Sequence, residues 1–425
     1  MKIICTSDWH LGNLFHCNDR LPEHEHFLQW LLGQIEEHRP DALLVAGDVF
    51  DNGNPSAKAQ SAYYKFLAEA TQRHHDMTIV ITAGNHDSAS RLEAPRELLT
   101  HHHVEVRGTI KRYWVTNADG QGDWQFDYDD LLIQLEGRQG DRAVVLAVPY
   151  LRSEMLRDAN YSQGVNNFLR SLTGRARELH RDVPLVMMAH MYATGADIAC
   201  HDASETFAIG GLDQVDMKGW TDHPDYLTCG HIHKRQHIWN TDWARYSGSV
   251  LPMSFAEKDY THGVDLVTLS PNHAPQVEQL VYTPQHRLVV LPEDDNPLTA
   301  AKLKKLINTT LTDRLDGKID PNAPYVMLRV AQEKLNNDEI HELDELVGLK
   351  NAILCRTQKF RPQLDATHAE QPVLRSVDDL LNSDPMLMLR QAFEVQKGHP
   401  LNERQLTMLN ELIRNIKHET NDRTS

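Results

Sequence analysis

The chain has 425 residues, of which 40% are hydrophobic and 24% charged, as is ordinary for a soluble globular protein. This length allows two or three domains and a large core. The formal net charge of −17 disfavours tight DNA binding by the chain alone, because phosphate contacts rely on Lys and Arg. It does not exclude a DNA substrate that a partner delivers.

The cysteine pattern indicates a reducing compartment. The five cysteines are scattered, odd in number and form no CxxC pair, so we expect neither a disulfide framework nor a zinc knuckle, and we expect a cytoplasmic location. No apolar stretch approaches the ~20 residues that a membrane helix needs. A cleavable leader is not expected either, because its removal would remove the candidate ligand Asp8.

A series of short apolar runs each ends on a residue type that binds metals. The runs are residues 2–7, 42–46, 78–82, 185–189 and 226–229. The residues that follow them are Asp8 and His10, Asp48 and Asp51, Asn85 and His86, His190, and His231 and His233. Such runs predict strands buried on both faces, and ligands in open α/β sheets gather beyond the carboxyl ends of strands. The pattern therefore predicts a metal-ion active site at one edge of one sheet.

Helical segments are predicted between these strands. Residues 23–38 and 56–74 have apolar positions at helical spacing, and Ser56 is a candidate N-cap. This alternation predicts βαβ units. After residue 106, strand-like segments at 112–115, 131–134 and 143–148 predict an antiparallel sheet, which a helix near 165–179 follows.

The chain is predicted to divide into four segments. Residues 1–282 form an α/β domain that carries the candidate site, and 283–360 form a small second domain with βαβαβ order. Residues 361–375 form a linker, and 376–425 form a tail with helices over 377–396 and 402–416. The apolar faces of the tail helices either pack on the body or dock a partner.

The mixture of candidate ligands suits a pair of metal ions. Hydrolysis of a phosphodiester needs neutralisation of the phosphate and a hydroxide at neutral pH, and two divalent ions about 3.5–4 Å apart supply both. A shared carboxylate holds two cations close together, and we assign this role to Asp48. Imidazoles mixed with Asp and Asn oxygens suit Mn²⁺, Fe²⁺ or Zn²⁺ better than Mg²⁺ or Ca²⁺. The lack of thiolates in the set argues against a structural zinc site.

Each motif alone has a simpler explanation, whereas the whole ordered set does not. With 25 histidines, an HxH triplet is common by chance, and Asp48 alone could be a cap or turn residue. Asp87 is expected to be a structural hydrogen-bonding group. His16, His24 and His26 are expected to be surface histidines.

The order of the motifs resembles that of the calcineurin-like metallophosphoesterases. Longer phrases resemble the SbcD family of bacterial nucleases: TSDWHLG at 6–12, AGDVFD at 46–51, AGNHDS at 83–88, PY at 149–150, GGLD at 210–213 and YSGS at 246–249. The resemblance is specific over residues 1–260, looser over the second domain and weak in the tail. It implies an α/β/β/α sandwich of two mixed sheets, a small α+β capping domain that contacts DNA, and a helical tail.

The resemblance also implies roles for individual residues. The first metal would be held by Asp8, His10, Asp48 and His233, and the second by Asp48, Asn85, His190 and His231. His86 would not bind metal but would protonate the leaving oxygen or stabilise its charge. Asp51 resembles the carboxylate that orients this histidine.

The implied function is that of a manganese-dependent DNA nuclease. Members of the family process double-stranded DNA ends and hairpins, as 3′→5′ exonucleases and endonucleases, in repair, recombination and replication. The implied partners are an SMC-like ATPase, SbcC, for which the tail is a candidate dock, and a second copy of the chain. The implied location is the bacterial cytoplasm, at the nucleoid during action. Two alternatives use the same core: a small-molecule phosphodiesterase, and a non-catalytic scaffold, although scaffolds usually lose ligands and every expected ligand is present here.

Overall fold

The computed structural model describes residues 1–116, 119–156, 158, 160–197, 214–270, 273–294, 296–331 and 337–360. The predicted linker, the predicted tail helices and the GGLD phrase lie outside these residues. None of the described helices is both long enough and apolar enough to cross a membrane.

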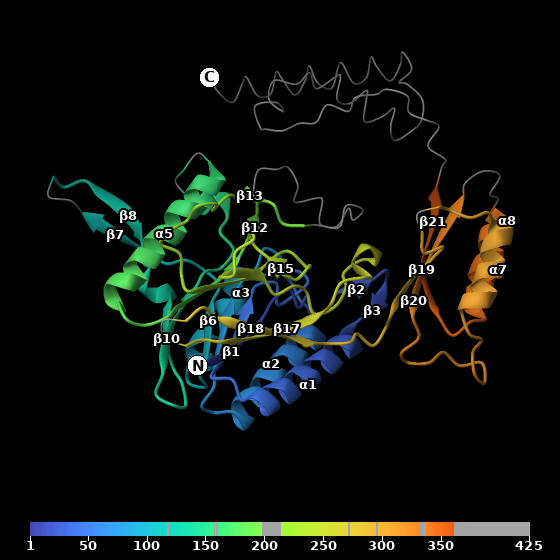
Figure 1. Cartoon of the computed structure of the whole chain (residues 1–425), viewed down its shortest axis with the longest axis horizontal. Helices are drawn as coiled ribbons and strands as arrows, with labels where there is room; N and C mark the ends of the chain where they lie inside the picture. Colours follow the sequence, from blue (N-terminus) through green and yellow to red (C-terminus); the bar gives the residue numbers. More distant parts are fainter. Residues whose placement is uncertain are drawn as a thin grey trace, which may run out of the picture. The chain divides into compact units, whose positions relative to one another are not determined.

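Two six-stranded sheets form the body that carries the candidate site (Figure 1). The first sheet has the order β18 (Gln276–Val281), β17 (Gly263–Thr268), β1 (Lys2–Thr6), β4 (Ala42–Ala46), β5 (Thr78–Thr82), β6 (Val104–Arg107). The second has the order β15 (Gln236–His237), β16 (Ala244–Tyr246), β14 (Tyr226–Gly230), β11 (Leu185–His190), β10 (Arg142–Ala147), β9 (Leu132–Glu136). In the first sheet β1, β4, β5 and β6 are parallel, and the pairs β1–β17 and β17–β18 are antiparallel. In the second sheet the four central strands are parallel and both edge strands, β9 and β15, are antiparallel to their neighbours, so both sheets are mixed.

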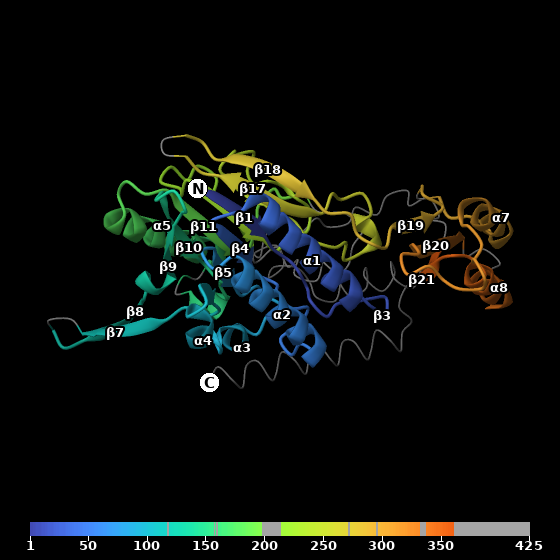
Figure 2. The same ribbon diagram turned by 90° about the horizontal axis from the view of Figure 1, so that it is seen from below.

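Helices cover the outer face of each sheet. Helices α1 (Leu21–His38) and α2 (Ala57–Arg73) lie along the first sheet, as Figure 2 shows, and share one apolar cluster with its outward residues, such as Ile4 and Val45. Helix α5 (Tyr161–Leu179) packs against outward residues of the second sheet, such as Leu146 and Met187. The side chains of Ser56 and Asn160 cap α2 and α5 by accepting backbone N–H groups.

A third apolar cluster lies between the two sheets. Leu44 and Val80 of the first sheet meet Val145, Val186 and Met188 of the second. Because strand side chains alternate between faces, each central strand contributes to this inner cluster and to an outer one. The resulting order is helix, sheet, sheet, helix, which is the α/β/β/α sandwich that the resemblance implied.

A smaller sheet is built from the C-terminal part of the described chain. It consists of β19 (Leu288–Leu291), β20 (Tyr325–Ala331) and β21 (Ile353–Phe360), all parallel, with α7 (Ala300–Thr310) and α8 (Asn337–Gly348). The order β19, α7, β20, α8, β21 is the predicted βαβαβ pattern. Its core centres on Leu303, Leu328 and Leu343. A separate cluster joins Tyr325 to Phe15 and Phe255 of the preceding region.

The remaining elements are short. They are β2 (Leu14–Phe15), β3 (Asn18–Asp19), α3 (Ala89–Glu93), α4 (Arg96–Thr100), β7 (Arg112–Thr116), β8 (Gly122–Phe126), β12 (Tyr192–Ala193), β13 (Gln214–Val215) and the 3₁₀ turns η1 (Asp129–Leu131), η2 (Ser153–Met155) and η3 (Phe255–Glu257).

Three sequence-based expectations need correction. The strands that end at the candidate ligands belong to two sheets, because β11 and β14 pair with each other and not with β5. The segment after residue 106 forms two separate antiparallel pairs, β7–β8 and β9–β10, and β10 is parallel to β11. His24 is fully buried on α1, whereas His16 and His26 are exposed as expected. Burial and the nearby charge of Arg20 lower the pKa of His24 to about 3, so it is a neutral core residue.

Truncation of Leu44 tests the packing between the sheets. Leu44→Ala should lower the free energy of unfolding by about 2–5 kcal/mol, because Leu44 is fully buried in the apolar cluster between the two sheets and its truncation leaves a cavity there. Leu14→Ala is the matched control, since Leu14 is 60% exposed and should change stability by less than about 0.5 kcal/mol. Urea unfolding measures both, and equal losses would contradict the assigned packing.

Candidate metal centre

The candidate ligands gather where the two sheets meet. Strands β1, β4 and β5 of the first sheet lead into Asp8 and His10, into Asp48, and into Asn85 and His86. Strand β11 of the second sheet ends at His190, and β14 leads into His231 and His233. The structure therefore brings together all seven side chains predicted to bind metals, and it places His86 beside them.

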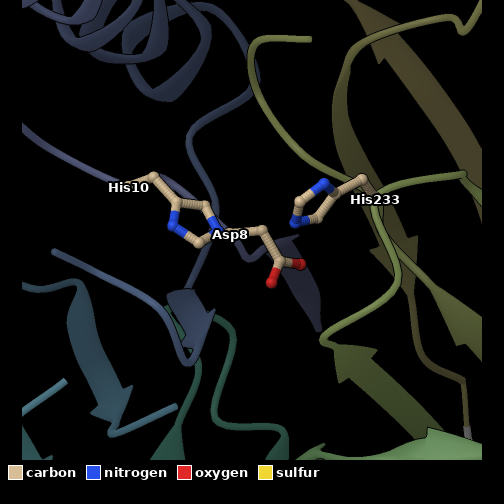
Figure 3. A group of neighbouring side chains, drawn as sticks. All are labelled: Asp8, His10 and His233. Carbon is tan, nitrogen blue, oxygen red and sulfur yellow. The ribbon is translucent and has the colours of Figure 1, made fainter. Parts of the chain in front are cut away.

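One group of candidate metal ligands is formed by Asp8, His10 and His233. Ligand atoms of these three residues lie within 4.8 Å of one another. Figure 3 shows the two imidazoles approaching the Asp8 carboxylate from opposite sides. The other Asp8 contacts fix this carboxylate, because Oδ1 accepts the backbone N–H of His231 at 3.0 Å and Oδ2 accepts the Ser7 hydroxyl.

A second group of donors is centred on the side-chain oxygen of Asn85. This Oδ1 atom lies 2.9 Å from His190 Nε2 and 3.0 Å from His231 Nδ1. His190 Nδ1 donates to the carbonyl of Ala46 at 3.0 Å, which fixes the ring so that Nε2 faces the site. The two histidines therefore present opposite ring nitrogens toward one oxygen.

Asp48 lies between the two groups. Its Oδ2 atom is 3.3 Å from His190 Nε2 and 3.7 Å from His10 Nε2, while Oδ1 accepts the backbone N–H of His86 at 2.9 Å. A carboxylate in this position lies close to candidate metal ligands of both groups, as a bridging ligand must.

The electrostatics of the site suit cations. Burial raises the pKa of Asp8. Burial also opposes ionisation of Asp48, but the adjacent His190 outweighs it, so the pKa of Asp48 lies far below its usual value. Burial lowers the pKa of His190, and the attraction of Asp48 outweighs this and raises it to about 9. Two closely spaced, buried carboxylates thus need neighbouring positive charge in order to remain ionised.

The imidazoles of His10 and His231 fit metal ligands. Burial lowers the pKa of His231 to about 3 and lowers that of His10 well below its usual value, so both rings are neutral at pH 7. Both ring nitrogens of His10 are buried without a hydrogen-bond partner among the described residues. Because an unsatisfied buried polar group is costly, these nitrogens fit a site completed by a metal ion.

The backbone at the site is strained. Asp8, His10, Asp48 and His231 have φ values of 52°, 47°, 49° and 98°, in the region that favours glycine. Such residues persist only where their surroundings hold them, and they cluster at functional sites. Here the surroundings include the hydrogen bonds from the N–H of His10 to Asp48 O and from the N–H of Asp8 to Gly47 O.

Two glycines permit the close approach of these loops. A Cβ atom on Gly84 would overlap the carboxylate and backbone nitrogen of Asp48, and one on Gly230 would overlap the carbonyl oxygen of Ala46 on the opposite sheet. Any side chain at either position would push the strand ends apart.

His86 and Asp51 lie at the outer side of the centre. His86 is exposed, and its ring can share a ligand group with His10 and Asp48. Its Nδ1 atom contacts the backbone carbonyl of Asp51 at 2.9 Å, not the carboxylate. The Asp51 carboxylate accepts from Asn13 at 2.8 Å and lies 3.7 Å from His10 Nδ1. The contact that orients His86 therefore comes from the main chain of Asp51.

Asp87 has the structural role expected of it. It is buried and accepts the backbone N–H groups of Val49, Phe50 and Gly84. These bonds tie the loop after β4 to the loop after β5.

Sequence reasoning missed Glu257, whose carboxylate lies 3.0 Å from His233 Nδ1, because no recognisable motif surrounds it.

Three basic residues, Arg91, Lys234 and Arg235, lie close to the motifs in the sequence, and two of them form ion pairs with Asp residues. Arg235 pairs with the buried Asp265 at 2.7 Å, and Lys234 pairs with Asp197. Arg91 contacts the neutral groups of Gly53 and Asn54. Two of the three basic residues beside the motifs are thus neutralised within the chain and add little attraction for phosphate.

Comparison with known proteins agrees with the geometry. The calcineurin-like phosphoesterase family matches residues 1–235, more than half of the chain. The chain belongs to this family. As a calcineurin-like phosphoesterase, it is a hydrolase of phosphoester bonds whose Asp and His clusters are those of a metal centre.

Relatives within the family are SbcD proteins, the nuclease components of SbcCD. The chain is 36% identical to SbcD of Rhodobacter capsulatus over 287 residues, which cover 65% of this chain and 68% of the relative. It is 33% identical to SbcD of Escherichia coli K12 over 314 residues, which cover 71% and 73%. It is 28% identical to SbcD of Bacillus subtilis over 345 residues, which cover 81% and 82%. The chain is therefore an SbcD-type phosphoesterase, and the resemblance seen in its motifs is confirmed.

Substitution of Gly84 tests the close approach at the centre. Gly84→Ala should weaken the binding of a divalent probe ion, Mn²⁺, because the added methyl group displaces the candidate ligand Asp48. Gly33→Ala is the matched control: Gly33 lies in α1 with no atom near its added Cβ, so it should keep metal binding and stabilise the helix by up to about 1 kcal/mol. Calorimetric Mn²⁺ titration and thermal melting measure the two effects. Wild-type affinity in Gly84→Ala would contradict the geometry.

Proposed function

We propose that this chain is a manganese-dependent DNA nuclease that cleaves double-stranded DNA ends and hairpins, as a 3′→5′ exonuclease and an endonuclease. The observation that carries the proposal is the position of Asp48 between two groups of donors from two sheets. Its relatives bear the name of the SbcCD nuclease, which supports a nucleic-acid substrate. Repair, recombination and replication are the processes in which such cleavage serves.

We assign the ligands as follows. Asp8, His10, Asp48 and His233 would hold one ion, and Asp48, Asn85, His190 and His231 would hold the other. When bound, two such ions neutralise phosphate charge and lower the pKa of bound water. Mn²⁺ is our choice because the set mixes neutral imidazoles with hard oxygen donors.

His86 would act on the leaving group. It is exposed at the edge of the centre, so a substrate phosphate can reach its Nε2 atom while Nδ1 is held by the carbonyl of Asp51. From there it would donate a proton to the leaving oxygen or stabilise its charge. Asp51 would orient His86 through this carbonyl. Its carboxylate, 3.7 Å from His10 Nδ1, would support His10 as well.

The proposed partners follow from the same relationship. The relatives belong to a complex named SbcCD, which supports an SbcC-type ATPase partner for this chain. Residues 283–360 would form the capping domain that contacts DNA, and the tail after residue 375 would dock the ATPase. A homodimer in the bacterial cytoplasm completes the proposal. A partner that delivers the DNA would also explain how a chain with a net charge of −17 can act on a polyanionic substrate.

The first experiment is cleavage of an end-labelled DNA hairpin with Mn²⁺. The unmodified chain should cut the hairpin, and Asp48→Asn should lose at least about 10³-fold in rate, because the bridging charge is removed. Asp41→Asn is the control, since Asp41 precedes the same strand, at the end opposite to Asp48, and should keep full activity. Circular dichroism confirms that the variants fold.

Near-normal cutting by Asp48→Asn would refute the site assignment. Hydrolysis of small phosphodiesters without cutting of DNA, even with the ATPase present, would favour the small-molecule alternative. Metal binding without any hydrolysis would favour the scaffold.

Replacement of His86 separates catalysis from metal binding. His86→Gln should keep both metal ions and lose about 10²–10⁴-fold in turnover, because a proton donor is lost while the buried ligands remain. His102→Gln, at an exposed turn, is the control. Mn²⁺ titration and single-turnover cleavage measure the two properties. Loss of a metal ion from His86→Gln would instead identify His86 as a ligand, which its place in the group with His10 and Asp48 makes a real alternative.

A further inference from the structure

Glu257 is a buried carboxylate that contacts the candidate centre from outside the predicted ligand set. It ends the 3₁₀ turn η3 and is 1% exposed. Its Oε1 atom lies 3.0 Å from His233 Nδ1, and its Oε2 atom accepts the backbone N–H of Met253 at 2.9 Å. Burial of a carboxylate is costly unless hydrogen bonds compensate it, and here both oxygens have such a bond.

This contact determines which nitrogen of His233 can bind a metal. The carboxylate accepts, so the Nδ1 atom of His233 donates and carries the hydrogen. The lone pair then lies on Nε2, the ring nitrogen directed toward Asp8 in Figure 3. Histidine ligands commonly donate their second ring nitrogen to a carboxylate, which fixes the tautomer and raises the basicity of the ligating nitrogen.

We propose that Glu257 is a positioning residue of the metal centre, which holds His233 in the tautomer and orientation needed to bind the ion shared with Asp8 and His10. The proposal rests on the metal centre of the proposed function, but not on DNA as the substrate.

The turn that carries Glu257 is itself held firmly. The Ser254 hydroxyl accepts the backbone N–H of Ala256 at the start of η3. Phe255 packs in an apolar cluster with Phe15, at a ring-centroid distance of 5.2 Å, and with Tyr325 and Met327 of the small sheet. The carboxylate is therefore fixed by packing on one side and by Met253 on the other. A rigid support of this kind gives a ligand a defined geometry.

Glu23 provides a matched comparison for a purely structural role. It is also 1% exposed and its Oε1 atom accepts from Arg20 at 2.9 Å and from the Tyr325 hydroxyl at 3.1 Å. None of these contacts involves a candidate ligand. Loss of the Glu23 charge should therefore affect stability without affecting the metal centre.

The test is calorimetric Mn²⁺ titration of the full chain, unmodified and as Glu257→Gln and Glu23→Gln, with thermal melting in the absence of metal. Glu257→Gln should weaken binding of one of two Mn²⁺ ions by about 10–100-fold. Its amide nitrogen cannot accept the N–H of Met253, so the side chain loses its fixed position. Glu23→Gln should keep wild-type affinity for both ions.

Wild-type affinity in Glu257→Gln would overturn the proposal, as would an equal loss of affinity in Glu23→Gln. Failure of the unmodified chain to cut DNA while it binds two Mn²⁺ ions would count against the nuclease and not against Glu257.

A measurement on the unmodified chain guards against misfolded variants. In ¹⁵N-histidine NMR spectra, His233, assigned with a His233→Gln variant, should be protonated at Nδ1 in the metal-free protein. Protonation at Nε2 alone would overturn the proposal.

Discussion

The metal centre depends on how closely the ends of two sheets approach each other. Gly230 has no side chain where the end of β14 meets the end of β4, and a Cβ atom there would overlap the carbonyl oxygen of Ala46 on the other sheet. Within the first sheet, a Cβ atom on Gly84 would overlap Asp48 in the same way. The apolar cluster between the sheets draws them together, and hydrogen bonds such as that from the N–H of His231 to Asp8 then join one sheet to the other. Packing and missing side chains thus act at the same place and bring the candidate ligands of the two sheets close together.

The candidate site lowers the stability of the fold. Four of the candidate ligand residues have positive φ values, and buried carboxylates and imidazoles occupy a position where apolar groups would be more stable. The surrounding layers compensate for this, since each central strand is apolar on both faces. A centre that is preformed in this way does not have to reorganise its side chains when charge develops in the reaction.

The succession of strands along the chain and the gathering of the candidate ligands at the strand ends could be predicted from the sequence because their signals are local. An apolar run followed by Asp or His marks both a strand and its chemistry, and the strands before Asp8, Asp48, Asn85, His190 and His231 all formed. The same signal could not show that the strands divide between two sheets, because pairing between β11 and β14 depends on long-range packing. Only the family resemblance indicated two sheets.

Other features left no local signal. His24 looks like any polar helix residue until its burial is seen, and the sequence around Glu257 has no motif. The use of the Asp51 carbonyl in place of its carboxylate likewise depends on the path of the backbone in the assembled fold.

The position of β1 has a consequence for how the chain is made on the ribosome. This first strand lies in the middle of its sheet, between β4 and the late strand β17, and Asp8 is bonded to His231, 223 residues further along. Contacts this distant in sequence form only after most of the chain has been synthesised. A nascent or prematurely terminated chain that stops before His231 therefore lacks two of the seven candidate ligands, together with the hydrogen bond that ties Asp8 to the second sheet.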